Sequence, residues 1–205
     1  MDLANMVGYF AFILVFVQLC LAIKASNYGF GLVSIEESEL TADFLLTKPV
    51  SRWQVLNSKL LGVLCNLLVT NGIIWAGSII FQLAFRGTQP VDTRTLAILL
   101  GSLFIFQLFF LAVGLLISLL VKRVRSVTPY GLGLGLGMYM LSAFSGLLGD
   151  VKLEYITPFK HFNPMYIAQN SAIDTPLMLL NVSVTILAVV ISYWRYIRRD
   201  IPAVS

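Results

Sequence analysis

Five apolar runs without a charged side chain take up most of this chain and restrict its fold more than any other feature. A helix needs about 20 mostly apolar residues to cross a bilayer. A charged residue at the centre of such a helix costs roughly 2.5–3.5 kcal/mol. The sequence therefore predicts an all-α membrane protein, a bundle of five transmembrane helices. The predicted spans are residues 7–23, 60–85, 96–121, 127–149 and 176–194.

The composition agrees with this class. The chain is 58% hydrophobic and 12% charged, whereas about 25% of the residues of a soluble domain are charged. We therefore expect residues 1–205 to form a single transmembrane domain. Cys20 and Cys65 both lie inside apolar runs, so we expect them to be buried small side chains and no disulfide or metal site.

The lysines and arginines predict the orientation. If the segment between the first two spans is cytoplasmic, ten of the 14 basic residues lie inside, as the positive-inside rule requires. This count places Lys24 at the cytoplasmic end of the first span. It also places the C-terminus in the cytoplasm and the N-terminus outside, in what we expect to be a bacterial plasma membrane. Membrane orientation thus accounts for the net charge, and a nucleic-acid partner is not expected.

The segment 35–59 is a long polar interruption between the first two spans. An amphipathic stretch, residues 40–47, ends before Pro49, and Ser51 and Arg52 begin the helix that enters the next span. A short helix held between two spans can transmit force from a soluble partner into the bilayer. The alternative is a solvated helix that only reverses the chain. An acidic cluster opens the segment: Glu36, Glu37 and Glu39.

Residues 150–175 form a predicted outer segment. Its aromatic residues recur at near-helical spacing, while Pro158 and Pro164 interrupt the backbone. This pattern predicts short helices at the outer interface with aromatic rings at headgroup level, or alternatively an ordered loop that caps the bundle. His161 is the one histidine in the chain. A single histidine offers no zinc site, so we expect it to pack or to hydrogen-bond.

Four glycines alternate with leucines inside the predicted span 127–149. They do not form a phosphate-binding loop, because no Lys and Ser/Thr follow them and they lie within a membrane span. Glycines four residues apart permit close contact between helices. We expect this contact within the subunit, and a contact across a dimer is the alternative. The glycines are Gly131, Gly133, Gly135 and Gly137.

Uncharged polar side chains also occur inside the spans. Most such groups hydrogen-bond between helices at a gain of roughly 0.6 kcal/mol. A polar substrate path is the alternative, with Asn66, Thr70 and Gln107 as candidates, and Asn66 and Thr70 share a helix face. The lack of charged residues within the predicted spans argues against a proton relay or a dedicated ion-coupling site. The other polar residues are Gln18, Asn71, Gln82, Asn181 and Ser183.

The stretch TADFLLTKPVSRWQVLNSKLL, residues 41–61, resembles the segment after the second span of ABC-2-type transporter permeases. In that family an acidic cluster, a threonine, an acidic-aromatic-Leu-Leu run and Pro-Val-Ser-Arg follow one another, as they do here. ITPFKHFNP at 156–164 is similar to the family's loop before the last span, and RRDI at 198–201 to its usual ending. Together these similarities cover most of the chain.

The resemblance implies a six-span fold in which the five spans here are the second to the sixth, so we expect that a first span is missing. It implies a homo- or heterodimer of permease subunits, bound to cytoplasmic ATPase subunits that hold ATP and Mg. This chain would bind no cofactor or metal and have no catalytic residue. A coupling helix near 39–47 would dock on the ATPase and drive export. The implied contacts are Glu36, Glu37, Glu39, Thr41, Asp43, Phe44, Leu45, Lys48, Pro49, Ser51 and Arg52.

Two other functions remain open. The chain could be a non-transporting scaffold or regulator derived from a permease. It could also be an intramembrane protease, because Glu36 and Glu37 resemble the start of a glutamate-dependent motif. That chemistry needs a metal or a base supported by several histidines, and His161 is predicted on the opposite side. The sequence does not identify a substrate: the apolar spans favour an amphiphile, but a lipid-facing surface explains the same composition.

Overall fold

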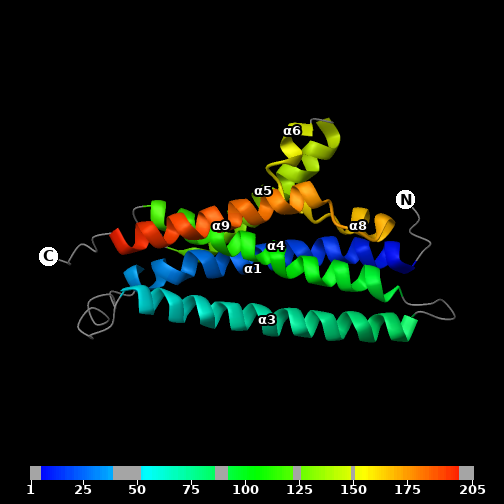
Figure 1. The fold of residues 1–205 in the computed structure, drawn as a ribbon, viewed down its shortest axis with the longest axis horizontal. Coiled ribbons are helices and arrows are strands. Elements are labelled where there is room, and N and C mark those ends of the chain that lie inside the picture. Colours follow the sequence, from blue (N-terminus) through cyan, green and yellow to red (C-terminus); the bar gives the residue numbers. More distant parts are fainter. Residues whose placement is uncertain (1–5, 39–51, 86–91, 122–125, 149–150, 199–205) are drawn as a thin grey trace.

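The computed structural model describes residues 6–38, 52–85, 92–121, 126–148 and 151–198, and the regular structure in these residues is helical throughout. The prediction of an all-α protein is confirmed. Figure 1 shows long helices lying side by side along one axis, with α6 and the adjoining end of α5 projecting from them. The helices are α1 (Met6–Ser38), α3 (Arg52–Phe85), α4 (Thr93–Leu120), α5 (Val127–Leu148), α6 (Val151–Glu154), α7 (Pro158–His161), α8 (Pro164–Asn170) and α9 (Thr175–Arg198).

Four helices in the described part of the chain are long and apolar enough to cross a membrane. They correspond to four of the predicted spans and extend beyond them at one or both ends. Helix α5 corresponds to the predicted span 127–149 and has 22 residues, but it is not among the four, so a fifth crossing stays a prediction. The four segments are Gly8–Ser34, Trp53–Phe85, Thr93–Leu120 and Thr175–Arg198.

Helix α1 is much longer than the first predicted span. The sequence suggested that the span ends at Ile23, but the helix continues to Ser38. Lysine is a good helix former and no proline follows it in this stretch, so the charge interrupts the apolar run without ending the helix. Lys24 therefore lies inside a continuous helix, within the apolar segment Gly8–Ser34, and the predicted end of the span at Ile23 stays a prediction. The remaining basic residues keep the same bias, and the orientation stays a prediction.

Helices α1 and α4 form the closely packed centre of the bundle. A Cβ added to Gly29 would lie 2.3 Å from the carbonyl oxygen of Leu111 and 2.8 Å from the amide nitrogen of Leu115. A Cβ added to Gly114 would lie 2.9 Å from the carbonyl oxygen of Ser26. The backbones therefore touch, and a side chain at either glycine would push them apart. This contact also sets residue 29 of α1 at the level of residue 114 of α4.

Aromatic side chains connect the outer segment to this centre. Phe106 on α4 is fully buried, and its ring centroid lies 5.0 Å from that of Phe159 and 6.4 Å from that of Phe162. Phe159 and Phe162 are buried as well, whereas Tyr155 and Tyr166 are exposed. The segment thus packs two of its aromatic residues into the bundle and presents two on its surface.

Both cysteines are free and exposed, contrary to the expectation that they are buried. The surface of a membrane-spanning bundle faces hydrocarbon, so its outer positions are as apolar as its core. An apolar run in such a chain therefore cannot distinguish a buried cysteine from one that faces lipid.

Candidate functional site

Much of the predicted coupling segment lies outside the described residues. The backbones of Glu36 and Glu37 lie in the last turn of α1, and Arg52 is the first residue of α3. These two helix ends lie at the same end of the bundle (Figure 1). The structure does not describe the following predicted contacts: Glu39, Thr41, Asp43, Phe44, Leu45, Lys48, Pro49 and Ser51.

The four glycines of α5 lie on two different faces of the helix. A Cβ added to Gly131 would meet Asn27 Oδ1 at 2.0 Å, and one added to Gly135 would meet Ile23 Cγ1 at 2.7 Å, so both pack against α1. A Cβ added to Gly133 or Gly137 would meet nothing within 4 Å. One glycine pair thus makes a close contact within the chain, and the other pair faces away from the described residues.

A group of polar side chains joins α1 to α3 halfway along both helices. Lys24 Nζ donates a hydrogen bond to Thr70 Oγ1 at 2.5 Å, and Tyr28 Oη donates to Asn66 Oδ1 at 2.9 Å. The Thr70 hydroxyl in turn donates to the Asn66 carbonyl oxygen at 2.8 Å. Lys24 Nζ also lies 5.6 Å from the ring centroid of Tyr28, within the range of a cation–π contact. We call these four residues the Lys24 cluster.

The Lys24 cluster lies near the middle of the bundle. Helices α1 and α4 run in the same direction (Figure 1). The contact between Gly29 and Gly114 therefore places Lys24, five residues before Gly29, at the level of Phe109, five residues before Gly114. At 1.5 Å per residue, Phe109 is about 4 Å from the midpoint of α4 along its axis. Helix α4 carries one charged residue, Arg94 in its first turn. If α4 crosses a hydrocarbon layer about 30 Å thick, the Lys24 ammonium group therefore lies inside that layer.

A lysine at this depth needs compensation, because a charged side chain at the centre of a span costs roughly 2.5–3.5 kcal/mol. The contacts of Lys24 are with neutral groups: the hydroxyl of Thr70 and the ring of Tyr28. Among the side chains that the structure describes, no carboxylate forms an ion pair with it. Ionisable residues inside the membrane commonly mark functional sites, and we take the Lys24 cluster as the candidate site.

A second polar contact joins α3 to α4. Gln107 Nε2 donates to Asn71 Oδ1 at 3.2 Å and to the Leu103 carbonyl oxygen at the same distance. Gln107 is fully buried, and its Oε1 has no hydrogen-bond partner among the described residues. Because Asn71 directly follows Thr70, α3 makes polar contacts with both of its neighbours at the same level.

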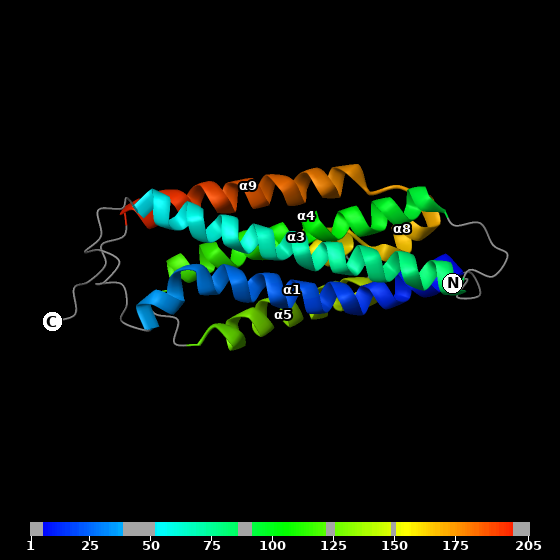
Figure 2. The same cartoon turned by 90° about the horizontal axis from the view of Figure 1, so that it is seen from below.

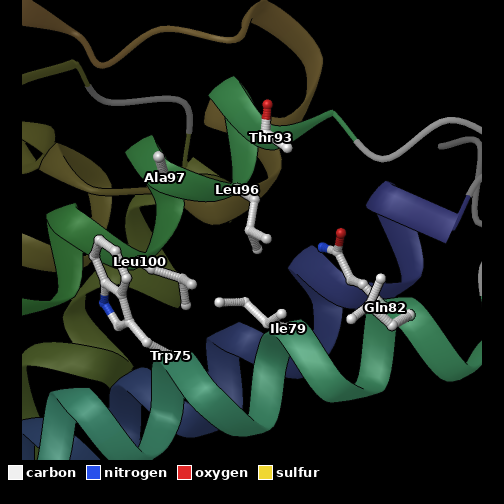
Figure 3. Close-up of a pocket in the computed structure, with 8 residues that line it drawn as sticks. Trp75, Ile79, Gln82, Thr93, Leu96, Ala97 and Leu100 are labelled. Carbon is white, nitrogen blue, oxygen red and sulfur yellow. The ribbon is translucent and has the colours of Figure 1, made fainter.

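Two apolar grooves separate α3 from α4 on either side of this contact. The first has a volume of about 360 Å³, and Figure 3 shows Leu96 and Leu100 of α4 pointing toward Ile79 of α3 across it. The second has a volume of about 500 Å³ and also reaches α9, with Leu64, Leu111 and Val189 in its lining. Helix α3 is thus packed loosely against α4 over much of its length.

The structure divides the predicted substrate path. Asn66 and Thr70 belong to the Lys24 cluster on the α1 side of α3, whereas Gln107 contacts Asn71 on the α4 side. The sequence interpretation missed Lys24 and Tyr28 as partners. One signal could have revealed them: they are four residues apart, the same spacing as Asn66 and Thr70, as expected for two antiparallel helices that pair along one face.

His161, at the end of α7 in the outer segment, is buried against α9. Its Nε2 lies 3.1 Å from the Glu154 carbonyl oxygen, and its Nδ1 lies 3.4 Å from Asn181 Nδ2. A neutral ring that donates from Nε2 and accepts at Nδ1 satisfies both contacts. The neighbouring residue Phe162 accepts a hydrogen bond from Gln18 of α1 at 2.7 Å. Gln18 lies about 27 Å from Glu36 along the axis of α1. The two groups of the protease alternative are therefore far apart.

The stability of the protein is expected to fall as the pH drops from 7.5 to 5.5. Burial lowers the pKa of His161 from its ordinary value of 6.5, so the folded protein binds this proton less readily than the unfolded chain. Stability is then lost as the pH falls below 6.5. Thermal denaturation of the detergent-solubilised protein measures the effect. His161 is the chain's one histidine, so H161Q should abolish most of the dependence, and an unchanged slope would contradict this explanation.

Comparison with known proteins gives one family. The family model for ABC-2 family transporter proteins matches residues 3–201, which is nearly the whole chain. No curated protein and no solved structure matches the sequence.

Proposed function

This chain belongs to the ABC-2 transporter family, and we propose that it couples ATP hydrolysis by a separate ATPase subunit to the export of a substrate. It is a multi-pass membrane protein and a permease subunit, the membrane component of such a transporter. In the proposed complex the ATPase supplies the sites for ATP and Mg, and a second permease subunit, identical or different, completes the pathway through the membrane.

The contrast between two helix contacts supports this proposal. Helices α1 and α4 touch backbone to backbone at Gly29 and Gly114. Helix α3, in comparison, makes no backbone contact of this kind among the described residues. It meets its neighbours through side chains: the ring pair of Phe10 and Phe81 toward one end, the polar groups in the middle, and an apolar cluster around the buried Leu67. A bundle with a rigid pair and a loosely attached helix is suited to a movement of the attached helix.

The position of α3 in the chain gives this movement a source. The predicted coupling helix near 39–47 precedes α3 in the chain, and α3 begins at Arg52. A push on that segment by the ATPase is transmitted along the axis of α3, because a helix is stiff along its length. The hydrogen bonds of Lys24 and Asn71 are then the contacts that break, while the glycine contact between α1 and α4 persists. The neutral hydrogen bond of Asn71 contributes about 1 kcal/mol and that of the charged Lys24 about 1.5–3 kcal/mol, which is within reach of such a step.

Association with the ATPase tests the coupling segment. We expect F44D and L45D to reduce co-purification of the ATPase subunit at least tenfold, because a carboxylate in an apolar docking contact is buried without a partner. Tyr166 is exposed on the outer segment, so Y166D is a matched control that should leave the ATPase bound. Wild-type levels of ATPase bound to F44D would contradict the proposed coupling contact. Full binding without ATP-dependent transport would indicate a scaffold or regulator.

A further inference from the structure

We propose that the Lys24 cluster binds the oxyanion headgroup, a phosphate or a carboxylate, of an amphiphile that this permease transports. The binding site follows from the structure alone, whereas the transport of its ligand rests on the proposed function. The inference thus gives the unknown cargo a chemical class.

The charge of Lys24 calls for an anion. An ammonium group has three N–H donors, and the hydrogen bond to the Thr70 hydroxyl uses one of them. The other described contact of the ammonium group is with the Tyr28 ring. In a layer of low dielectric constant, a cation without a counter-ion attracts an oxyanion far more strongly than it does in water. A phosphate or carboxylate next to Nζ would therefore complete the site.

The other members of the cluster match the same class of ligand. Asn66 has an amide NH₂ that can donate to an oxyanion, whereas the hydroxyl groups of Tyr28 and Thr70 already donate to Asn66. None of the four side chains carries a negative charge, so the cluster offers no attraction to a cationic headgroup. Asn66 is exposed and Lys24 is half-buried, so a ligand can reach both without unfolding the bundle. Figure 2 shows α1 and α3 in front of the other long helices, close together toward one end and diverging toward the other.

The depth of the cluster indicates an amphiphile. A free anion at mid-bilayer would have to leave water entirely, which is very costly. The surface of α3 next to the cluster is apolar, with Leu68 57% exposed and Ile73 69% exposed. An anion with an attached hydrocarbon chain can place that chain along these side chains while its headgroup reaches Lys24. The apolar surroundings and the single cation together thus select an anionic amphiphile.

Binding of dodecyl phosphate to the purified full chain in dodecyl maltoside micelles tests this site. We expect K24M to bind it at least tenfold more weakly, because the charge-assisted hydrogen bond is lost. K24R should bind within about threefold of the wild type, because it retains the charge. N66L, at an exposed position, should weaken binding about threefold, and this variant decides the question if K24M does not fold. Lys160 lies in the outer segment, where it pairs with Glu154 at 3.7 Å, so K160M is the matched control and should bind normally.

Further ligands separate the possible sources of the anion. Inorganic phosphate should not compete, and dodecylphosphocholine, in which a cation offsets the phosphate charge, should bind more weakly than dodecyl phosphate. Equal binding of dodecyl phosphate by K24M and the wild type would overturn the site, and equal binding of inorganic phosphate would overturn the assignment to an amphiphile. A change of oligomeric state in K24M with unchanged binding would assign Lys24 to a subunit contact instead. The assay contains no ATPase, so a failure of the coupling proposal would not affect it.

Discussion

Replacing Gly29 with alanine is expected to destabilise the protein by about 3 kcal/mol or more, at or above the upper end of the usual cost of overpacking. The new Cβ would lie 2.3 Å from the Leu111 carbonyl oxygen and 2.8 Å from the Leu115 amide nitrogen. Neither backbone atom can move aside as a flexible side chain could, so α1 and α4 must separate. Because close packing replaces the hydrophobic effect as the force between helices in a membrane, this separation weakens the centre of the bundle.

The matched control for this substitution is G133A. It introduces the same methyl group into a helix, but at a position where a Cβ meets nothing within 4 Å. We expect G29A to lower the thermal midpoint of the solubilised protein by roughly 6–12 °C, taking 2–4 °C per kcal/mol for a chain of this size. G133A should leave it unchanged or raise it slightly, since alanine favours a helix. Equal midpoints for the two variants would show that the α1–α4 contact is not as close as described.

Replacing Phe106 with alanine is expected to cost about 3 kcal/mol. The side chain is fully buried, and its ring centroid lies 5.0 Å from those of both Phe110 and Phe159. Removing a buried phenylalanine from a soluble core costs about 3–5 kcal/mol. We expect the lower end of that range, because hydrocarbon solvates the ring even when the helices separate, so the cost arises mainly from the cavity. The outer segment should detach first, because Phe159 and Phe162 pack on this ring.

Phe144 on α5 provides the control, since its side chain is 56% exposed. F144A removes the same atoms without opening a cavity and should change the thermal midpoint by less than about 2 °C. Limited proteolysis of the outer segment provides a second measurement, and F106A should be cut there faster than the wild type. Similar midpoints and similar proteolysis for F106A and F144A would contradict the role of the aromatic cluster.

The span boundaries show which parts of the fold the sequence could predict. The apolar runs correctly located four helices, because about 20 uncharged apolar residues have few other stable structures in a bilayer. The first helix extends beyond the predicted span, whose end was placed at a charged residue. Within this helix, a hydrogen bond that Lys24 donates to Thr70 of α3 and an aromatic ring next to the ammonium group accommodate the charge. These partners lie more than 40 residues away or on the next turn, and an apolar run does not reveal them.

The glycines give a similar result for the packing. The sequence singled out the alternating glycines of α5, and the structure places Gly131 and Gly135 against α1. It did not single out Gly29 and Gly114, which make the backbone contact between α1 and α4. Each has a small residue four positions away, Ala25 before Gly29 and Ser118 after Gly114, but the sequence interpretation did not use this spacing. The contact depends on the position of one helix against another.

The sequence by itself determined that this chain is a helical membrane protein of the ABC-2 family, because long uncharged apolar runs and an ordered motif are properties of the chain taken one segment at a time. Only the tertiary structure decided what the polar residues inside the spans do. Whether Lys24 lies at the end of a helix or in the middle of the bundle depends on the register of α1 against α4 and on the side chains that α3 brings beside it. Register and contact between helices arise from packing over the whole bundle, and local composition does not encode them.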